Sequence, residues 1–105
     1  MNLLTLRQTI AHQAQADIDA GLFESANAIG GLKRIGDHEV WFDQDEDLLE
    51  NGQMSLHGVS GTIVMSAFHE FPNGADHVSE HQTSFRLAIE GGTVRVSLGR
   101  FRCID

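Results

Sequence analysis

The sequence predicts an α+β fold, in which an N-terminal amphipathic helix packs on an antiparallel sheet of about four to six strands that ends in a C-terminal β-hairpin. Apolar residues recur at helical spacing over residues 3–20. From residue 32 onward the pattern changes to the alternation typical of strands, with glycines between the segments. A chain of 105 residues has the apolar material for one core, so residues 1–105 are expected to form a single domain.

The first predicted element is a helix over residues 3–20. Spacings of three and four place its apolar side chains on one stripe, which consists of Leu3, Leu6, Ile10, Ala14 and Ile18. Thr5 and Gln8 fit a capping box, and Asn2 is the alternative cap. A second, shorter helical piece is expected at residues 22–29.

A first hairpin is predicted from residues 32–35 and 38–42. Gly36 and Asp37 separate the two segments and fit a two-residue turn that starts with glycine. In that register Arg34 lies opposite Glu39, an ion pair that supports the register more than it stabilises the fold.

The middle of the chain is expected to alternate loops with strands. Residues 43–50 fit a loop or a helical turn, and residues 54–59 a short strand. Residues 62–68 carry apolar side chains at both parities, which predicts a central strand covered on both faces. The polar residues 75–81 are expected to form a loop.

The C-terminal hairpin is the best specified element. A two-residue turn at Gly91-Gly92 pairs Phe85 with Leu98, Leu87 with Val96, and Ile89 with Val94, all facing the core. After Leu98 the apolar parity shifts, so one extra residue enters the ladder, and Gly99 is the expected bulge. The opposite face is cationic and is a candidate contact between subunits of a homo-oligomer; its residues are Arg86, Arg95, Arg100 and Arg102.

Charge is distributed unevenly along the chain, whose formal net charge is −8 and whose pI is about 5.0. Between Arg34 and Arg86 there is no lysine or arginine, yet this segment contains ten carboxylates and five of the six histidines. Binding to nucleic acid or to anionic lipid relies on clustered basic residues, so neither is expected as a direct partner. An uncompensated anionic surface favours a basic protein surface as partner.

The candidate partner-binding residues are an aromatic side chain and the acidic run that follows it. They are Trp41, Asp43, Asp45, Glu46, Asp47 and Glu50. An exposed aromatic residue beside charges is a common layout for a binding surface, although Trp41 could instead cap the core under the helix. The first functional hypothesis is therefore a non-catalytic, inhibitor-type binding protein that docks a basic surface, for example the nucleic-acid channel of an enzyme.

Histidines supply the main alternative hypothesis. The string from His77 to His81 matches H-x-x-E-H, a zinc motif in which two histidines one helical turn apart bind metal. Without catalysis, Zn²⁺ or Ni²⁺ could be bound by a set that consists of His69, His77, Glu80 and His81. A small metal-binding protein or metal-dependent hydrolase is the first alternative, and a structural subunit of a homo-oligomer is the second.

No other catalytic or targeting signal is recognisable. The sequence has no G-x-S-x-G string, and the parity of Cys103 predicts a buried thiol that behaves as a small hydrophobic group. Apart from the metal-dependent hydrolase alternative, we therefore expect no enzyme activity, and no cofactor beyond Zn²⁺ or Ni²⁺. A single cysteine, the lack of a long apolar run and an N-terminus without secretory features predict a cytoplasmic location.

Overall fold

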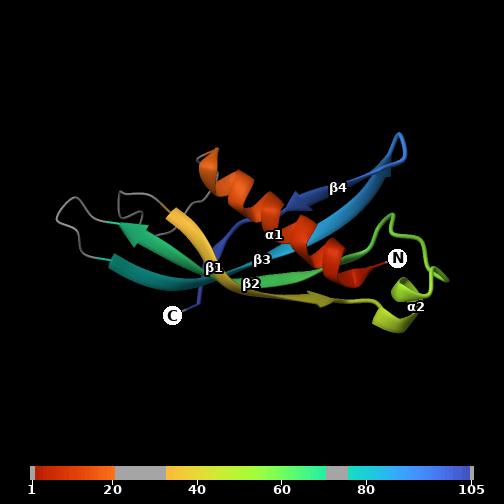
Figure 1. Cartoon of the computed structure of the whole chain (residues 1–105), viewed down its shortest axis with the longest axis horizontal. Coiled ribbons are helices and arrows are strands. Elements are labelled where there is room, and N and C mark those ends of the chain that lie inside the picture. The colour runs from red at the N-terminus through yellow and green to blue at the C-terminus, as the bar shows by residue number, and fades with distance from the viewer. Residues whose placement is uncertain (1, 21–32, 71–75, 105) are drawn as a thin grey trace.

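A long helix lies across one face of an antiparallel sheet in the computed structural model, which describes residues 2–20, 33–70 and 76–104 (Figure 1). The elements are α1 (Leu3–Asp19), β1 (Lys33–Phe42), α2 (Glu46–Glu50), β2 (Ser60–Glu70), β3 (Asp76–Glu90), β4 (Thr93–Leu98) and β5 (Arg102–Cys103). The helix-on-sheet fold predicted from the sequence is confirmed. The helical piece expected at residues 22–29 lies outside the described residues.

The apolar stripe of α1 is buried as predicted, with Ala11 added to it. The capping box is wrong: the helix begins at Leu3, and the side chain of Asn2 accepts a hydrogen bond from the backbone N–H of Leu4 at 2.9 Å. Thr5 is therefore the third residue of the helix and lies inside the first turn, so it does not occupy the N-cap position that a capping box requires. Among the described residues, neither helix has the length and hydropathy needed to cross a bilayer.

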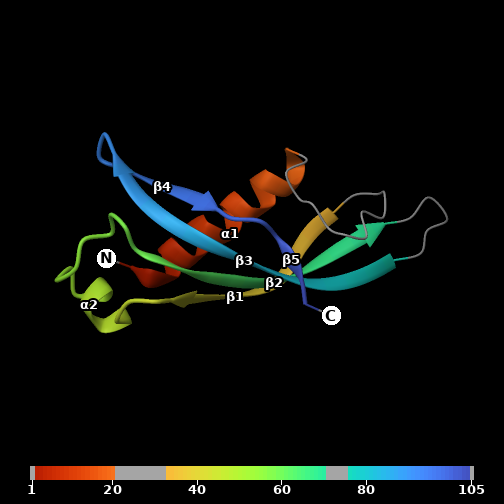
Figure 2. The same cartoon turned by 180° about the vertical axis from the view of Figure 1, so that it is seen from behind.

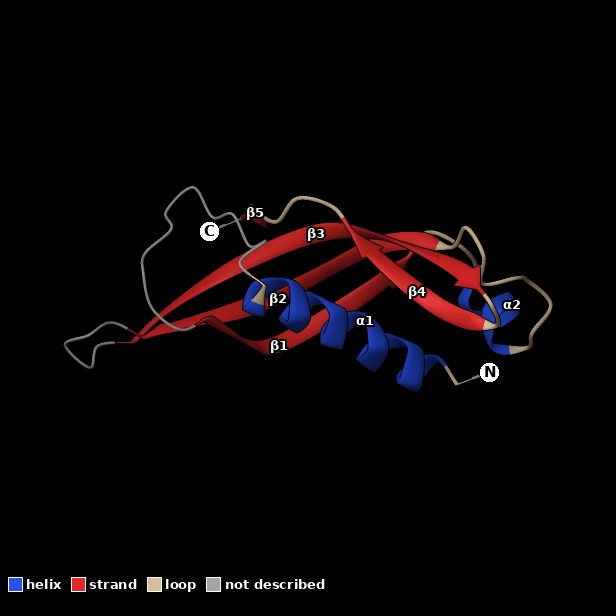
Figure 3. Ribbon diagram, turned by 90° about the horizontal axis from the view of Figure 1, so that it is seen from above, coloured by secondary structure: helices blue, strands red, loops and turns tan. Residues whose placement is uncertain are grey.

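The strand order is β1-β2-β3-β4, with every neighbouring pair antiparallel. β5 continues past β4 and pairs with β3 (Figure 2). β2 and β3 are thus interior strands, and β1 is an outer strand. Figure 3 shows α1 over the sheet with its N-terminal end toward α2. The core lies between α1 and the sheet, and its fully buried large apolar side chains are Ile10, Leu49, Ile63, Met65 and Leu87.

The β3–β4 hairpin has the predicted register. Gly91 and Gly92 both have positive φ, at 57° and 80°, which a two-residue turn of this kind requires. The three predicted pairs are present, although Ile89 at the tip is exposed. Between β4 and β5 the register shifts by one residue, as predicted. A Cβ on Gly99 would lie 2.6 Å from the hydroxyl of Ser84, an exposed side chain that would have to rotate to make room.

β1 corrects the first predicted hairpin. Residues 33–42 form one strand along β2, and the register shifts between Ile35 and His38. Gly36 and Asp37 therefore form a bulge and not a turn. Arg34 lies opposite Phe68 and Glu39 opposite Val64, so the expected Arg34–Glu39 pairing is wrong. The same β2 strand pairs with both halves, which local sequence does not reveal.

Three expectations for the middle of the chain are also corrected, and one is confirmed. Residues 43–50 contain the helical turn α2, as expected. Residues 54–59 form turns and not a strand, while residues 76–81 begin β3 and are not a loop. In β2 only one face is buried, and Val64 and Phe68 on the other face are half-buried. The sheet therefore has one face covered by α1 and a second that we call the open face.

Candidate functional site

No strand of the described part of the chain pairs with the outer edge of β1 over its second half. The backbone N–H of Asp43 donates to the carbonyl of Ser60 on β2 at 2.9 Å. In an antiparallel ladder the backbone groups of successive residues point to alternate sides, so those of Glu39 and Trp41 also point toward β2. The N–H and C=O groups of His38, Val40 and Phe42 consequently point outward. Among the described residues these groups have no hydrogen-bond partner.

The first half of β1 differs because the helix covers it. The N–H of Ile35 also points outward, but it donates to the side chain of Gln15 on α1 at 2.9 Å. The bulge at Gly36 and Asp37 separates this covered part from the open part. The outward backbone groups that lie open beside the second half of β1 are therefore those of residues 38–42.

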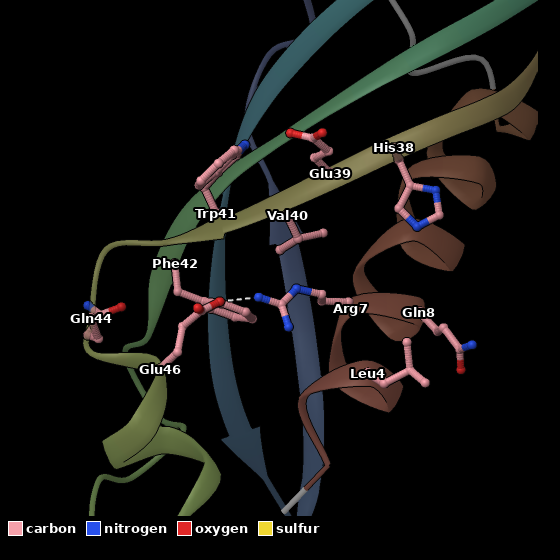
Figure 4. A pocket seen from close by; sticks show the side chains of 10 residues that line it. All are labelled: Leu4, Arg7, Gln8, His38, Glu39, Val40, Trp41, Phe42, Gln44 and Glu46. Carbon is pink, nitrogen blue, oxygen red and sulfur yellow. Dashed lines mark hydrogen bonds and ion pairs between the residues drawn. The ribbon is translucent and has the colours of Figure 1, made fainter.

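A groove of about 810 Å³ lies along the open part of this edge (Figure 4). It is lined by Leu4, Arg7 and Gln8 of α1, by residues 38–42 of β1, and by Gln44 and Glu46 beyond the strand. Leu4 is 63% exposed, although helical periodicity puts its neighbours Leu3 and Leu6 in the core. The groove thus combines exposed apolar surface with unpaired backbone groups.

Arg7 joins the elements at one end of the groove. Its guanidinium forms an ion pair with Glu46 and lies over the ring of Phe42, 5.3 Å from the ring centroid. Both charged side chains are partly exposed, so the pair contributes less than about 1 kcal/mol to stability. Its main consequence for the site is that the charge of Glu46 is already compensated within the molecule.

Two further residues of the predicted acidic set have structural roles. Asp45 is the N-cap of α2, and its side chain accepts hydrogen bonds from the backbone N–H groups of Asp47 and Leu48 at 2.9 and 3.4 Å. Asp43 accepts a hydrogen bond from the hydroxyl of Ser60 at 2.9 Å. The expectation that the carboxylates between Arg34 and Arg86 are uncompensated within the molecule is therefore too broad.

Two other carboxylates remain available to a partner. Glu39 and Asp47 are exposed and have no ion-pair partner among the described residues. Glu50 is exposed at the end of α2 but already interacts with another residue of the chain. Glu39 was absent from the set predicted from the sequence, where it was expected to pair with Arg34; the observed register separates the two residues.

Trp41 lies on the open face of the sheet and is 61% exposed. Phe42 points to the opposite face, where its ring meets that of Phe85 edge to face with centroids 5.6 Å apart. Figure 4 shows Glu39 and Trp41 projecting away from α1, whereas Phe42 points toward Arg7. The alternative that tryptophan caps the core under the helix is therefore wrong, and Phe42 has that position.

The candidate oligomer contact lies toward the opposite margin of the sheet from Trp41. Arg86, Arg95, Arg100 and Arg102 are all exposed. Arg95 forms an ion pair with Glu90 at 2.8 Å, and the hydrogen bond and charge of that carboxylate raise the pKa of Arg95. Arg102 lies opposite Gln82, in the row of the ladder that continues through Val64 to Glu39. The open face therefore has an acidic margin at β1 and a basic margin at β5.

The histidines of the metal hypothesis lie on strands. His69 pairs with His77, and His81 pairs with Met65; the side chains of His69 and His77 lie outside the described part. His81 is buried, with its Nε2 2.6 Å from the hydroxyl of Ser79, whereas Glu80 is exposed on the opposite face. Glu80 and His81 therefore do not face a common ion. Within the described residues, no three histidine, cysteine or carboxylate side chains are grouped to hold a metal.

No protein-family model, no curated protein sequence and no solved structure gives a significant match to this chain.

Proposed function

We propose that this protein is a non-catalytic binding protein, and that it docks a basic surface of a partner protein against Trp41 and the nearby carboxylates of β1 and α2. The observation that carries the proposal is the exposure of Trp41. A large aromatic side chain that is 61% exposed leaves apolar area in water that a partner could bury. Its neighbour Phe42 supplies the packing in the core, so stability does not account for Trp41.

Charge supports the same proposal. Glu39 lies two residues from Trp41 on the same face of β1, and Asp47 lies on α2, which follows the strand. Neither has an ion-pair partner among the described residues. Exposed carboxylates beside an aromatic anchor favour cationic partners, chiefly by accelerating association.

The test compares two double variants of equal charge. Glu39→Gln with Asp47→Asn removes two charges of the proposed docking surface, and Asp17→Asn with Asp19→Asn removes two at the C-terminal end of α1. The second pair preserves acceptor oxygens for Gln13 and Gln15, which donate to these residues. The immobilised protein is exposed to an extract of its host at about 0.05 M and about 0.5 M salt. Retained proteins are identified, purified and assayed for association rate.

We expect a basic protein that is retained at low salt and released at high salt. Its association should be slowed by Glu39→Gln with Asp47→Asn and unchanged by the control pair. Trp41→Ala should accelerate its dissociation. Retention that is insensitive to salt, or that both double variants weaken equally, would contradict the proposal.

A further inference from the structure

The open part of the β1 edge offers a partner more than charge. Three residues, His38, Val40 and Phe42, present outward N–H and C=O groups beside a groove. Such an edge is a template on which a further strand can add, with backbone hydrogen bonds supplying affinity and alternate side chains supplying specificity. The covered half of β1, where Gln15 already occupies the N–H of Ile35, limits any added strand to residues 38–42.

A second copy of this chain is a poor occupant of the edge. Antiparallel pairing of two β1 edges would place the Glu39 side chains of both copies on the same face of the joined sheet and close to each other. Like charges that face each other across strands are destabilising. The acidic edge therefore disfavours self-pairing and favours a strand of positive charge.

The two faces of β1 define the side chains that an added strand should carry. On the open face it would lie beside Glu39 and Trp41, which favour lysine or arginine through charge and cation–π contact. On the groove face it would lie beside Val40 and the exposed Leu4, which favour an apolar residue. Side chains of an extended segment alternate between faces, so the matching sequence alternates basic and apolar residues.

We propose that the partner docks by adding an extended segment of alternating basic and apolar residues to the outer edge of β1 at residues 38–42. This inference rests on the proposed function, because it specifies how the basic partner is held. The segment becomes an additional strand of the sheet beside β1. Its basic side chains contact Glu39 and Trp41, and its apolar side chains enter the groove between β1 and α1.

The test uses a short blocked peptide of alternating lysine and valine, with two N-methylated analogues as matched controls. One analogue is methylated at every valine and the other at every lysine. In an extended strand these two sets of N–H groups point to opposite edges. Only the analogue methylated on the edge that faces β1 loses its hydrogen bonds, and its affinity should fall by about tenfold or more. The other analogue should bind like the parent peptide.

Amide hydrogen exchange locates the contact on the protein. Addition of the parent peptide should slow exchange at His38, Val40 and Phe42. Exchange at Glu39 and Trp41 should change little, because their backbone groups already point toward β2. Protection that alternates along the strand in this way distinguishes strand addition from general stabilisation of the fold.

The outcomes separate this inference from the proposed function. If the parent peptide binds with the salt dependence and Trp41 dependence described above, but both analogues bind equally well or equally poorly, strand addition is wrong and basic docking stands. If the parent peptide does not bind at all, strand addition is contradicted, whereas basic docking is decided by the salt-dependent retention and the double variants described above. Association of the protein with itself in light scattering, with protection of the same three amides and no peptide present, would identify a second copy as the occupant and overturn the inference.

Discussion

On the face of the sheet that α1 covers, the strands present Ile63, Met65 and Leu87, each no more than 1% exposed. On the open face the sheet presents Trp41 and Glu39 at β1, while β2 and β3 present polar residues such as Thr62 and Ser84 together with the half-buried Val64 and Phe68. Strand alternation divides the residues of one strand between the two faces. One residue of a strand can therefore stabilise the core while its neighbour, on the other face, contacts a partner.

The comparison is sharpest at Val40 and Trp41. Val40 is buried against α1, and Trp41 next to it is largely in solvent. Both belong to an outer strand, so the open face, the groove and the unpaired backbone edge meet at this place. A partner that adds beside β1 would contact all three.

The largest effect is expected from the covered face. Leu87→Ala should lower the free energy of unfolding by about 2–5 kcal/mol, because it removes buried methyl groups and leaves a cavity. Arg86→Ala, one residue away on the open face, should change it by less than about 0.5 kcal/mol. Urea denaturation followed by circular dichroism measures both. Similar losses of unfolding free energy for the two variants would contradict the difference between the two faces.

A smaller effect is expected from two glycines that face opposite sides. A Cβ on Gly61 would lie 2.0 Å from the backbone oxygen of Trp41 and 2.8 Å from the ring of Phe85. A Cβ on Gly36 would lie 2.3 Å from the ring of Phe68, a half-buried side chain on the open face that can move aside. Gly61→Ala should therefore cost about 1–3 kcal/mol, and Gly36→Ala less. If urea denaturation instead showed a larger loss of stability for Gly36→Ala than for Gly61→Ala, the open face would be packed more rigidly than the covered one.

Two residue pairs that begin with glycine show which turns could be predicted from the sequence. Gly91-Gly92 was correctly interpreted as a turn, because both residues adopt positive φ and the flanking alternation is local. Gly36-Asp37 looks similar in sequence but forms a bulge, and Gly36 does not have positive φ. The difference comes from β2, which pairs with residues on both sides of the bulge. Such long-range pairing is absent from a local pattern.

Polarity misled the prediction for the start of β3. Residues 76–81 look like a loop, yet Ser79, His81 and Thr83 are buried and face the covered side. Tertiary context overrides low strand propensity where a polar side chain has a hydrogen-bond partner, such as the Ser79 hydroxyl at the His81 ring. The H-x-x-E-H string therefore lies on a strand, so its two histidines are not one helical turn apart as the zinc motif requires.

The candidate site was predictable only in part. Parity indicated that either Trp41 or Phe42 would be less buried, but the choice depends on which face α1 covers. Glu39, Leu4 and the edge at residues 38–42 were missed, because strand order decides which strand is outermost. Asp45 and Asp47 both read as surface charge, although the first caps α2. The charge pattern of the sequence identified the acidic region around β1 and α2, but only the strand order shows which of its residues lie at an open edge.

The smallest effect on stability, and the most direct measure of the open face, is expected at Trp41. Trp41→Ala should change the free energy of unfolding by less than about 0.5 kcal/mol, since a residue that is 61% exposed loses little on truncation. Because Trp41 is the only tryptophan in the chain, its fluorescence reports this surface alone. Emission of the free protein should be that of a solvated indole and strongly quenched by acrylamide.

Binding of the lysine–valine peptide should shift the Trp41 emission to shorter wavelength and protect the indole from quenching. Phe42→Leu provides the control on the opposite face: it should lower stability and leave the emission wavelength unchanged. An indole already shielded in the free protein would mean that the open face is covered before any partner arrives, and the division between the two faces would no longer hold.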